Sequence, residues 1–324
     1  MRLGRILFCF VAVLFLAGCS LHGTEGEQQY EAEGAASGME SGNMSLGQET
    51  LPEIAAIPDV LIPQASGEKV KETERVRIDY SNTADGYVMV CFREETEKRL
   101  KVQVKGPAVT YTYSIGVGEW ETFPLSDGNG EYRIAVYENV EGSKYALVES
   151  VGMTVELTDE FAPFLRPNQY VDYADAMVTR ETAARLSAGK ETELEKVQAV
   201  YEYVVGTLSY DKELAATVQS GYLPELDKVI EKKKGICFDY AALMTGMLRS
   251  QSVPCKLVVG YAGTVYHAWI SVYTEAEGWI DRVIYFDGEV WKRMDPTFAS
   301  SGGSSEEIME FIGDGTNYKE KYLY

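Results

Sequence analysis

The sequence predicts an α+β protein in which a small all-β sandwich of the immunoglobulin type precedes a helix-rich domain. Apolar and polar residues alternate at many points between residues 71 and 157, which is the period of half-buried strands. From residue 194 onward apolar residues recur every three or four positions, and strand-like segments follow. A helical period followed by strands is typical of a separate α+β domain.

Length and charge narrow the possible functions. A chain of 324 residues is longer than one average domain needs, which favours two domains and a targeting or linker segment. Its 45% hydrophobic and 11% aromatic residues indicate a folded chain. The net charge of −20 repels a polyanion wherever the charge is not locally inverted. We therefore expect no nucleic-acid partner.

Residues 1–18 are predicted to be a signal peptide. Two arginines precede a 13-residue apolar run that is too short to span a bilayer comfortably. The sequence Leu16-Ala17-Gly18-Cys19 that ends it resembles the lipobox of bacterial lipoproteins. The resemblance implies a lipid on Cys19 that anchors the protein to the cell membrane, facing the extracytoplasmic side. A plain secretory signal with a chance cysteine is the alternative.

Residues 19–70 are expected to form a flexible acidic linker. Nine acidic residues stand against a single base, Lys69, and no helical or alternating period is present. Such a chain repels itself and extends. A short strand around residues 54–62 is the alternative for its last part.

The predicted sandwich covers residues 71–157. Turn residues such as those at 127–130 and 141–143 separate its alternating segments. The expected strands are residues 87–92, 100–104, 109–113, 132–137 and 151–155. Because we find no acid pair, metal cluster or phosphate loop among them, we expect an accessory role, to bind or to space.

The second predicted domain covers residues 158–324 and follows a proline-containing break at 159–167. Its helices are expected over residues 194–208 and 236–248, with strands at 256–261, 265–273 and 290–294.

Few residues of the predicted domains can carry chemistry. Their only histidine is His267, and their cysteines are Cys91, Cys237 and Cys255. Without a CxxC pair, a GxSxG motif or a glycine-rich phosphate loop, we expect no metal and no cofactor. A cysteine nucleophile paired with His267 is what remains, and we expect no disulfide on Cys237.

Cys237 is expected in the first turn of its helix, just after three lysines. Free N–H groups, the helix dipole and the nearby lysines favour a thiolate there. His267 is expected on the strand face opposite Ala268, so it need not be a core residue. Asp295 ends a strand, from which its carboxylate can orient the imidazole if the two strands are neighbours. Each of the three residues also has a purely structural interpretation. Cys237 can be a buried apolar residue, His267 a histidine whose hydrogen bonds are satisfied, and Asp295 part of a turn.

Several motifs surround these residues in a specific order. They are residues 235–243, 248–254, 259–261, 267–269 and 291–297. Together they resemble the core of the transglutaminase-like superfamily over residues 165–300. The resemblance implies a papain-like fold in which Cys237 is the nucleophile, His267 the acid and base, and Asp295 the orienting group.

Three tyrosine or tryptophan side chains are further candidates. Tyr210 lies upstream of the nucleophile, where such folds place an oxyanion-stabilising group. Tyr222, in the loop before Cys237, and Trp269 are candidates to line the cleft, with packing as the alternative for Trp269.

We therefore expect a surface-anchored cysteine enzyme that acts on peptide or carboxamide bonds of a protein or peptide through a thioester. It is a protease, an amidase or an acyl transferase, and the sequence leaves these outcomes and the oligomeric state open. The alternative from another class is a non-catalytic cell-surface binding protein that uses the transglutaminase-like domain as a scaffold.

Overall fold

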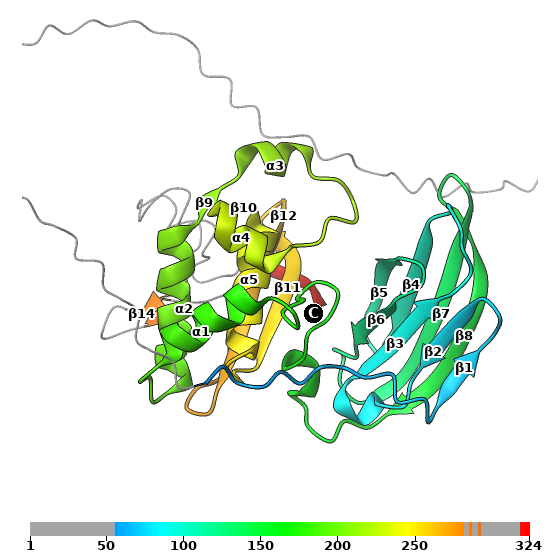
Figure 1. Cartoon of the computed structure of the whole chain (residues 1–324), viewed down its shortest axis with the longest axis horizontal. Helices are drawn as coiled ribbons and strands as arrows, with labels where there is room; N and C mark the ends of the chain where they lie inside the picture. Colours follow the sequence, from blue (N-terminus) through cyan, green and yellow to red (C-terminus); the bar gives the residue numbers. More distant parts are fainter. Residues whose placement is uncertain (1–55, 282–284, 287–290, 293–317) are drawn as a thin grey trace, which may run out of the picture. The chain divides into compact units, whose positions relative to one another are not determined.

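The computed structural model describes residues 56–281, 285–286, 291–292 and 318–324, all within one compact unit (Figure 1). The predicted signal peptide, Cys19 and Asp295 lie outside these residues. Helices and strands are mixed in this unit, as the sequence predicts. In the part of the chain so described, no helix has the length and apolar character needed to cross a bilayer.

Two four-stranded antiparallel sheets come first along the chain (Figure 1). The first has the order β1 (Val70–Glu72), β2 (Val76–Asp79), β3 (Tyr87–Phe92) and β6 (Trp120–Pro124). The second has the order β5 (Thr110–Ile115), β4 (Leu100–Lys105), β7 (Gly130–Glu141) and β8 (Lys144–Val155). A short 3₁₀ turn, η1 (Thr83–Asp85), lies between β2 and β3.

The alternation of apolar and polar residues explains how these strands bury one face of each sheet. In β4, Leu100, Val102 and Val104 are buried, whereas Lys101 and Gln103 are only partly buried. Buried residues of both sheets belong to one hydrophobic cluster. The five predicted strands are confirmed, with β7 and β8 longer than expected. The immunoglobulin type of this region stays a prediction.

Residues 56–69 correct part of the predicted linker. They form no helix or strand, which also removes the alternative strand over residues 56–62. Val60 nevertheless packs against the hydrophobic core, and Pro63 is buried. Arg180 Nη2 donates a hydrogen bond to Pro58 O at 3.1 Å. This stretch is held against the folded chain because its apolar residues find partners there.

The second half of the described chain places helices against a third antiparallel sheet. After η2 (Ala162–Phe164), the helices are α1 (Met177–Ser187), α2 (Glu193–Thr207), α3 (Lys212–Thr217), α4 (Leu226–Lys232) and α5 (Cys237–Arg249). The sheet has the order β13 (Gly278–Asp281), β12 (Val265–Thr274), β11 (Cys255–Ala262) and β16 (Tyr318–Leu323). Two short pairs are β9 (Ser209–Tyr210) with β10 (Lys234–Gly235), and β14 (Tyr285–Phe286) with β15 (Trp291–Lys292).

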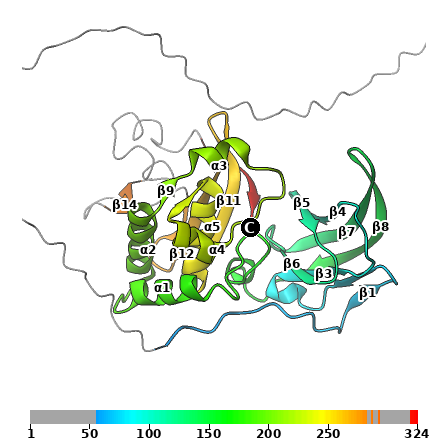
Figure 2. The same cartoon turned by 45° about the horizontal axis from the view of Figure 1, so that its top comes forward.

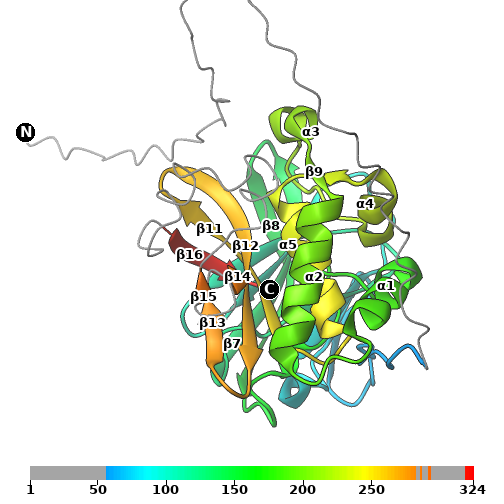
Figure 3. The ribbon, with the colours of Figure 1, turned by 90° about the vertical axis from the view of Figure 1, so that its left-hand side faces the viewer.

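Helix α5 is the centre of this half. Nearly all its residues are buried, as expected of a helix that is apolar on all sides. It packs against β11, β12 and helix α2, as Figures 2 and 3 show. The predicted helices correspond to α2 and α5, and the predicted strands at 256–261 and 265–273 to β11 and β12. Of the strand predicted at 290–294, the described residues form β15.

Arg249, the last residue of α5, is a buried cation that ties three segments together. Its guanidinium donates to Cys255 O (2.8 Å), to Arg166 O (2.8 Å) and to Tyr324 O (2.6 Å). The side chain is 3% exposed. Removing the guanidinium would take a charged donor from all three oxygens, of which Tyr324 O keeps a hydrogen bond from Leu257 N. Such a loss is costly in a buried site.

We therefore predict that Arg249→Met lowers the free energy of unfolding by about 3 kcal/mol or more, because three buried carbonyls lose a charged donor. Urea denaturation monitored by circular dichroism measures the change. Arg185→Met on helix α1 is the control, since Arg185 is partly exposed and its ion pair with Glu181 spans 3.9 Å. It should change stability by less than about 0.5 kcal/mol. Equal effects of the two substitutions would contradict the prediction.

Candidate active site

Cys237 is the first residue of helix α5, as the sequence predicts. The preceding residue, Ile236, is extended (φ −98°, ψ 175°) and occupies the N-cap position. The first main-chain bond of the helix runs from Tyr240 N to Ile236 O at 3.1 Å. Because isoleucine has no polar side-chain atom, it offers no cap to the N–H groups of the first turn. These N–H groups are suited to bind a carbonyl oxygen or an oxyanion.

Asp239 holds the start of this helix in place. Its Oδ2 accepts a hydrogen bond from Ile236 N at 2.8 Å, and its Oδ1 accepts one from the Tyr222 hydroxyl at 2.7 Å. A Cβ at Gly235 would lie 2.6 Å from the Asp239 Cβ, so this close approach requires glycine. Burial raises the pKa of Asp239, while the hydrogen bonds from Tyr222 and Ile236 oppose that rise.

Tyr222 therefore contacts helix α5 through the buried carboxylate of Asp239. The sequence places it in the loop before Cys237 as a candidate to line the cleft. The structure shows its hydroxyl directed at Asp239, which is a supporting contact. Its contribution to a cleft stays a prediction.

Tyr210 lies beside the segment that leads into Cys237. Strand β9 pairs in parallel with β10, and Tyr210 is opposite Gly235 in that pairing. The next residue, Asp211, donates its N–H to Gly235 O at 2.8 Å. The fold thus places Tyr210 opposite the residue two positions before Cys237. Its role at an oxyanion stays a prediction.

Strand β12 brings the His267 segment to the same region. It packs against α5, and His267 is opposite Gly260 of β11 in the ladder. The residue before it, Tyr266, has its pKa raised to about 12, first by burial and then by the charges of Tyr322, Tyr261 and Cys237. Helix α5, which begins at Cys237, thus lies beside the strand that holds His267.

The His267 face of β12 is buried, although the sequence pattern left open whether His267 is a core residue. His267 is 6% exposed and Trp269 is 1% exposed. Their ring centroids are 6.3 Å apart, and the Tyr318 ring lies 6.5 Å from His267 and 5.1 Å from Trp269. The aromatic ring of Tyr318 from β16 covers this face. For Trp269, packing is thus the alternative that the structure supports over cleft lining.

Gly260 permits this arrangement. A Cβ at this position would lie 2.1 Å from the backbone oxygen of Lys319 and 2.8 Å from the Trp269 ring. Strand β16 and the Trp269 ring therefore approach β11 more closely than any other residue at position 260 would allow.

The three described cysteines differ in accessibility. Cys91 and Cys255 are buried, Cys237 is partly exposed, and none of the three forms a disulfide within the described residues. Burial raises the pKa of Cys255 to about 11 and also raises the pKa of Cys91. Both therefore stay protonated thiols at neutral pH. Asp295, the predicted third member of the site, lies outside the described residues.

Two features of this site were not predicted from the sequence. One is the ring contact of Tyr170 with Phe238, the residue after Cys237, at 5.5 Å. The other is the ring contact of His267 with Tyr318, at 6.5 Å. Within the described ranges, no group of three or more His, Cys, Asp or Glu side chains is arranged to hold a metal ion.

The hydrogen bond between Tyr222 and Asp239 should stabilise the fold to a degree that depends on pH. The pKa of Asp239 is raised in the folded state, so its protonated form stabilises the fold and this contribution is lost as pH rises through that raised pKa. The Tyr222 hydroxyl opposes this rise, so its removal in Tyr222→Phe raises the pKa of Asp239 further. We predict that the stability lost in Tyr222→Phe is larger at pH 7 than at pH 4, measured by urea denaturation at both values.

Tyr203→Phe is the matched control, because the hydrogen-bond partner of Tyr203 is the neutral Thr182. The stability change in this control should be the same at the two pH values. If the stability lost in Tyr222→Phe is also the same at both pH values, the prediction is wrong, and the hydrogen bond from Tyr222 does not depend on the protonation state of Asp239.

Comparisons with known proteins agree with the motifs in this region. Residues 180–282 match the family model of the transglutaminase-like superfamily. The uncharacterized protein YebA of Bacillus subtilis (strain 168) is 26% identical over 181 residues, which are 48% of this chain and 24% of that protein. The chain thus spans about a quarter of the length of that relative.

Solved structures show distant likeness. A candidate cysteine protease from Cytophaga hutchinsonii is 15% identical, with a TM-score of 0.38 over 79% of this chain and 73% of that chain. The transglutaminase of red sea bream is 14% identical, with a TM-score of 0.27 over 65% of this chain and 48% of that chain. The family match, together with the order of the Cys237 and His267 motifs, identifies residues 180–282 as a transglutaminase-like domain.

Proposed function

We propose that this protein is a cysteine enzyme that attacks a peptide or carboxamide carbonyl through Cys237, with His267 as acid and base and Asp295 as the orienting group. One observation carries the proposal. Cys237 begins a buried helix whose N-cap has no polar side chain, and that helix packs against the strand that holds His267. Members of the transglutaminase-like superfamily are typically cysteine hydrolases or acyltransferases, which agrees with this chemistry.

The proposed reaction has two steps. The Cys237 sulfur attacks the carbonyl carbon, and N–H groups of the first turn of α5 stabilise the oxyanion. His267 gives a proton to the leaving amine, the C–N bond breaks, and a thioester remains on Cys237. Water or an amine then attacks the thioester and gives its proton to His267, so that Cys237 leaves with the electrons of the broken C–S bond.

We predict that Cys237→Ala and His267→Ala each remove nearly all turnover, and that the double variant is scarcely worse, because residues that act as one unit are not additive. Asp295→Ala should have a smaller effect, since Asp295 only holds the imidazole. Losses on the order of 10²- to 10⁴-fold are typical of an acid and base step. Release of ammonia or of peptide fragments from casein or a glutamine-containing peptide measures turnover.

Cys255→Ala is the matched cysteine control, because Cys255 is buried and its thiol stays protonated. It should keep its turnover if it remains folded in a thermal melt. Selective alkylation of Cys237 by iodoacetamide at mildly acidic pH supports the enzyme. A Cys237 thiol no more reactive than free cysteine, with no turnover of any acyl donor, would favour the non-catalytic binding protein instead.

We also propose that a lipid on Cys19 anchors the protein to the cell membrane. The support is the lipobox-like sequence Leu16-Ala17-Gly18-Cys19 after an apolar run. The mature chain would lose Arg2 and Arg5 with the signal peptide, so its charge would change from −20 to −22. An anionic membrane surface would not hold so acidic a protein, and the lipid must do so.

We predict that metabolic labelling with a fatty-acid analogue marks the wild type and that Cys19→Ala loses the mark. Cys9→Ala is the matched control, because Cys9 lies within the apolar run of the same segment. It should keep the label. Equal labelling of the Cys19→Ala variant and the wild type would contradict the anchor without bearing on the reaction at Cys237.

A further inference from the structure

The sheet β5-β4-β7-β8 has one face that is polar and basic. Neighbouring strands place Lys105 opposite Arg133, Gln103 opposite Thr112, and Lys101 opposite Tyr137. Because side chains alternate along a strand, these residues leave the sheet on the side away from the buried Val102 and Val104. We call this side, with Arg99 and Tyr145 at its end, the open face.

The cations of the open face lack the partners that the other cations of this region have. Residues 70–157 contain ten Lys and Arg residues. Six of them form ion pairs with glutamates: Lys71, Arg75, Arg77, Arg93, Lys98 and Lys144. The other four are Arg99, Lys101, Lys105 and Arg133, and no ion pair found among the described residues includes them.

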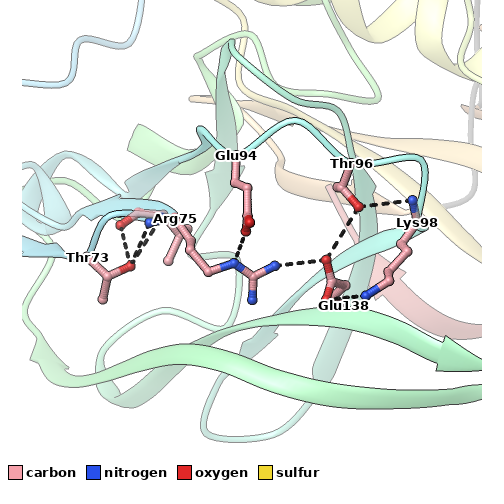
Figure 4. Close-up of polar contacts among 7 residues, drawn as sticks. Thr73, Arg75, Glu94, Thr96, Lys98 and Glu138 are labelled. Atoms are coloured by element: carbon pink, nitrogen blue, oxygen red, sulfur yellow. Dashed lines mark hydrogen bonds and ion pairs between the residues drawn. The ribbon is translucent and has the colours of Figure 1, made fainter.

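Figure 4 shows two cations of the same region, Arg75 and Lys98, that are paired with carboxylates. Arg75 bonds Glu94 and donates from Nη2 to Glu138 at 2.8 Å, and Lys98 donates to the other oxygen of Glu138 at 3.1 Å. In contrast, Arg133 donates to the neutral Ser150 hydroxyl at 2.9 Å. The carboxylate of Glu131, two positions before Arg133 on β7, accepts a hydrogen bond from the Thr154 hydroxyl at 2.5 Å. The open face therefore carries positive charge on a chain whose net charge is −20.

A hollow of about 660 Å³ lies on this face, within the range of ligand sites. Its lining includes Arg99, Lys101, Gln103, Thr112, Tyr137 and Tyr145. The Lys101 ammonium lies 4.7 Å from the centre of the Tyr145 ring. The lining thus combines two cations, two tyrosine rings, a side-chain amide and a hydroxyl.

We propose that the open face binds an acidic polysaccharide. The cations complement its anionic groups, the tyrosine rings offer apolar surface to sugar rings, and Gln103 and Thr112 offer hydrogen bonds to sugar hydroxyls. A polypeptide fits less well, because peptides bind sheets mainly through main-chain hydrogen bonds at an exposed edge. The central strands β4 and β7 already use their main-chain groups in the ladders.

The test is binding of the full chain to two acidic polysaccharides, polygalacturonate and dextran sulfate, with neutral dextran as the reference. We expect the wild type to bind one or both acidic polymers and not neutral dextran, with affinity that falls as salt is added. The double variant Lys101→Glu/Arg133→Glu should bind at least about tenfold more weakly. Comparing the two acidic polymers shows whether carboxylate or sulfate is recognised.

Lys190→Glu/Lys212→Glu is the matched control, because both lysines are exposed, lie outside the open face, and give the same change of net charge. It should bind like the wild type. Equal binding by the open-face variant and the control overturns the proposal, as does the absence of binding to both acidic polymers. Equal affinity for polyglutamate overturns the polysaccharide assignment. None of these results depends on turnover at Cys237.

Discussion

The buried guanidinium of Arg249 is the contact on which the position of the candidate nucleophile depends. It bonds carbonyls of three segments at the last turn of α5. At the other end of the same helix, Asp239 bonds Ile236 N and the Tyr222 hydroxyl. A helix of 13 residues that is held at both ends behaves as a rigid element. Cys237 is therefore placed by the packing of the core and not by a loop.

The two halves of the described chain share this core through aromatic rings. Tyr111 and Tyr113 of strand β5 contact Tyr324 at centroid distances of 5.7 and 5.8 Å. Tyr170 contacts Tyr324 at 4.5 Å and Phe238 at 5.5 Å. Buried residues of both halves also belong to one hydrophobic cluster. The first two sheets are thus packed against the transglutaminase-like domain and are not a separate body on a linker.

The spacing of apolar residues along the sequence predicted the helices and strands that are long enough to show such a pattern. Strand β3, helix α2 and helix α5 were expected within a residue or two, because β3 is a continuous apolar run and both helices carry a sustained helical period. Strand β1 has three residues and helix α3 six, too few to show a period. The burial of His267 was missed because Tyr318, which covers it, comes 51 positions later in the sequence (318 − 267). The sequence near residue 267 gives no sign of a contact with a residue so far along the chain.

The geometry also determines how binding at the open face and chemistry at Cys237 would be related. Strand β5 contributes Thr112 to the open face, while its neighbours Tyr111 and Tyr113 point into the aromatic contacts with Tyr324. One strand therefore carries the proposed polysaccharide site on one side and the junction with the transglutaminase-like half on the other. A ligand on the open face would hold the whole core, and with it α5, in a defined orientation. The accessory sheets would then orient the thiol toward substrates near that polymer, which a flexible linker between two bodies does not achieve.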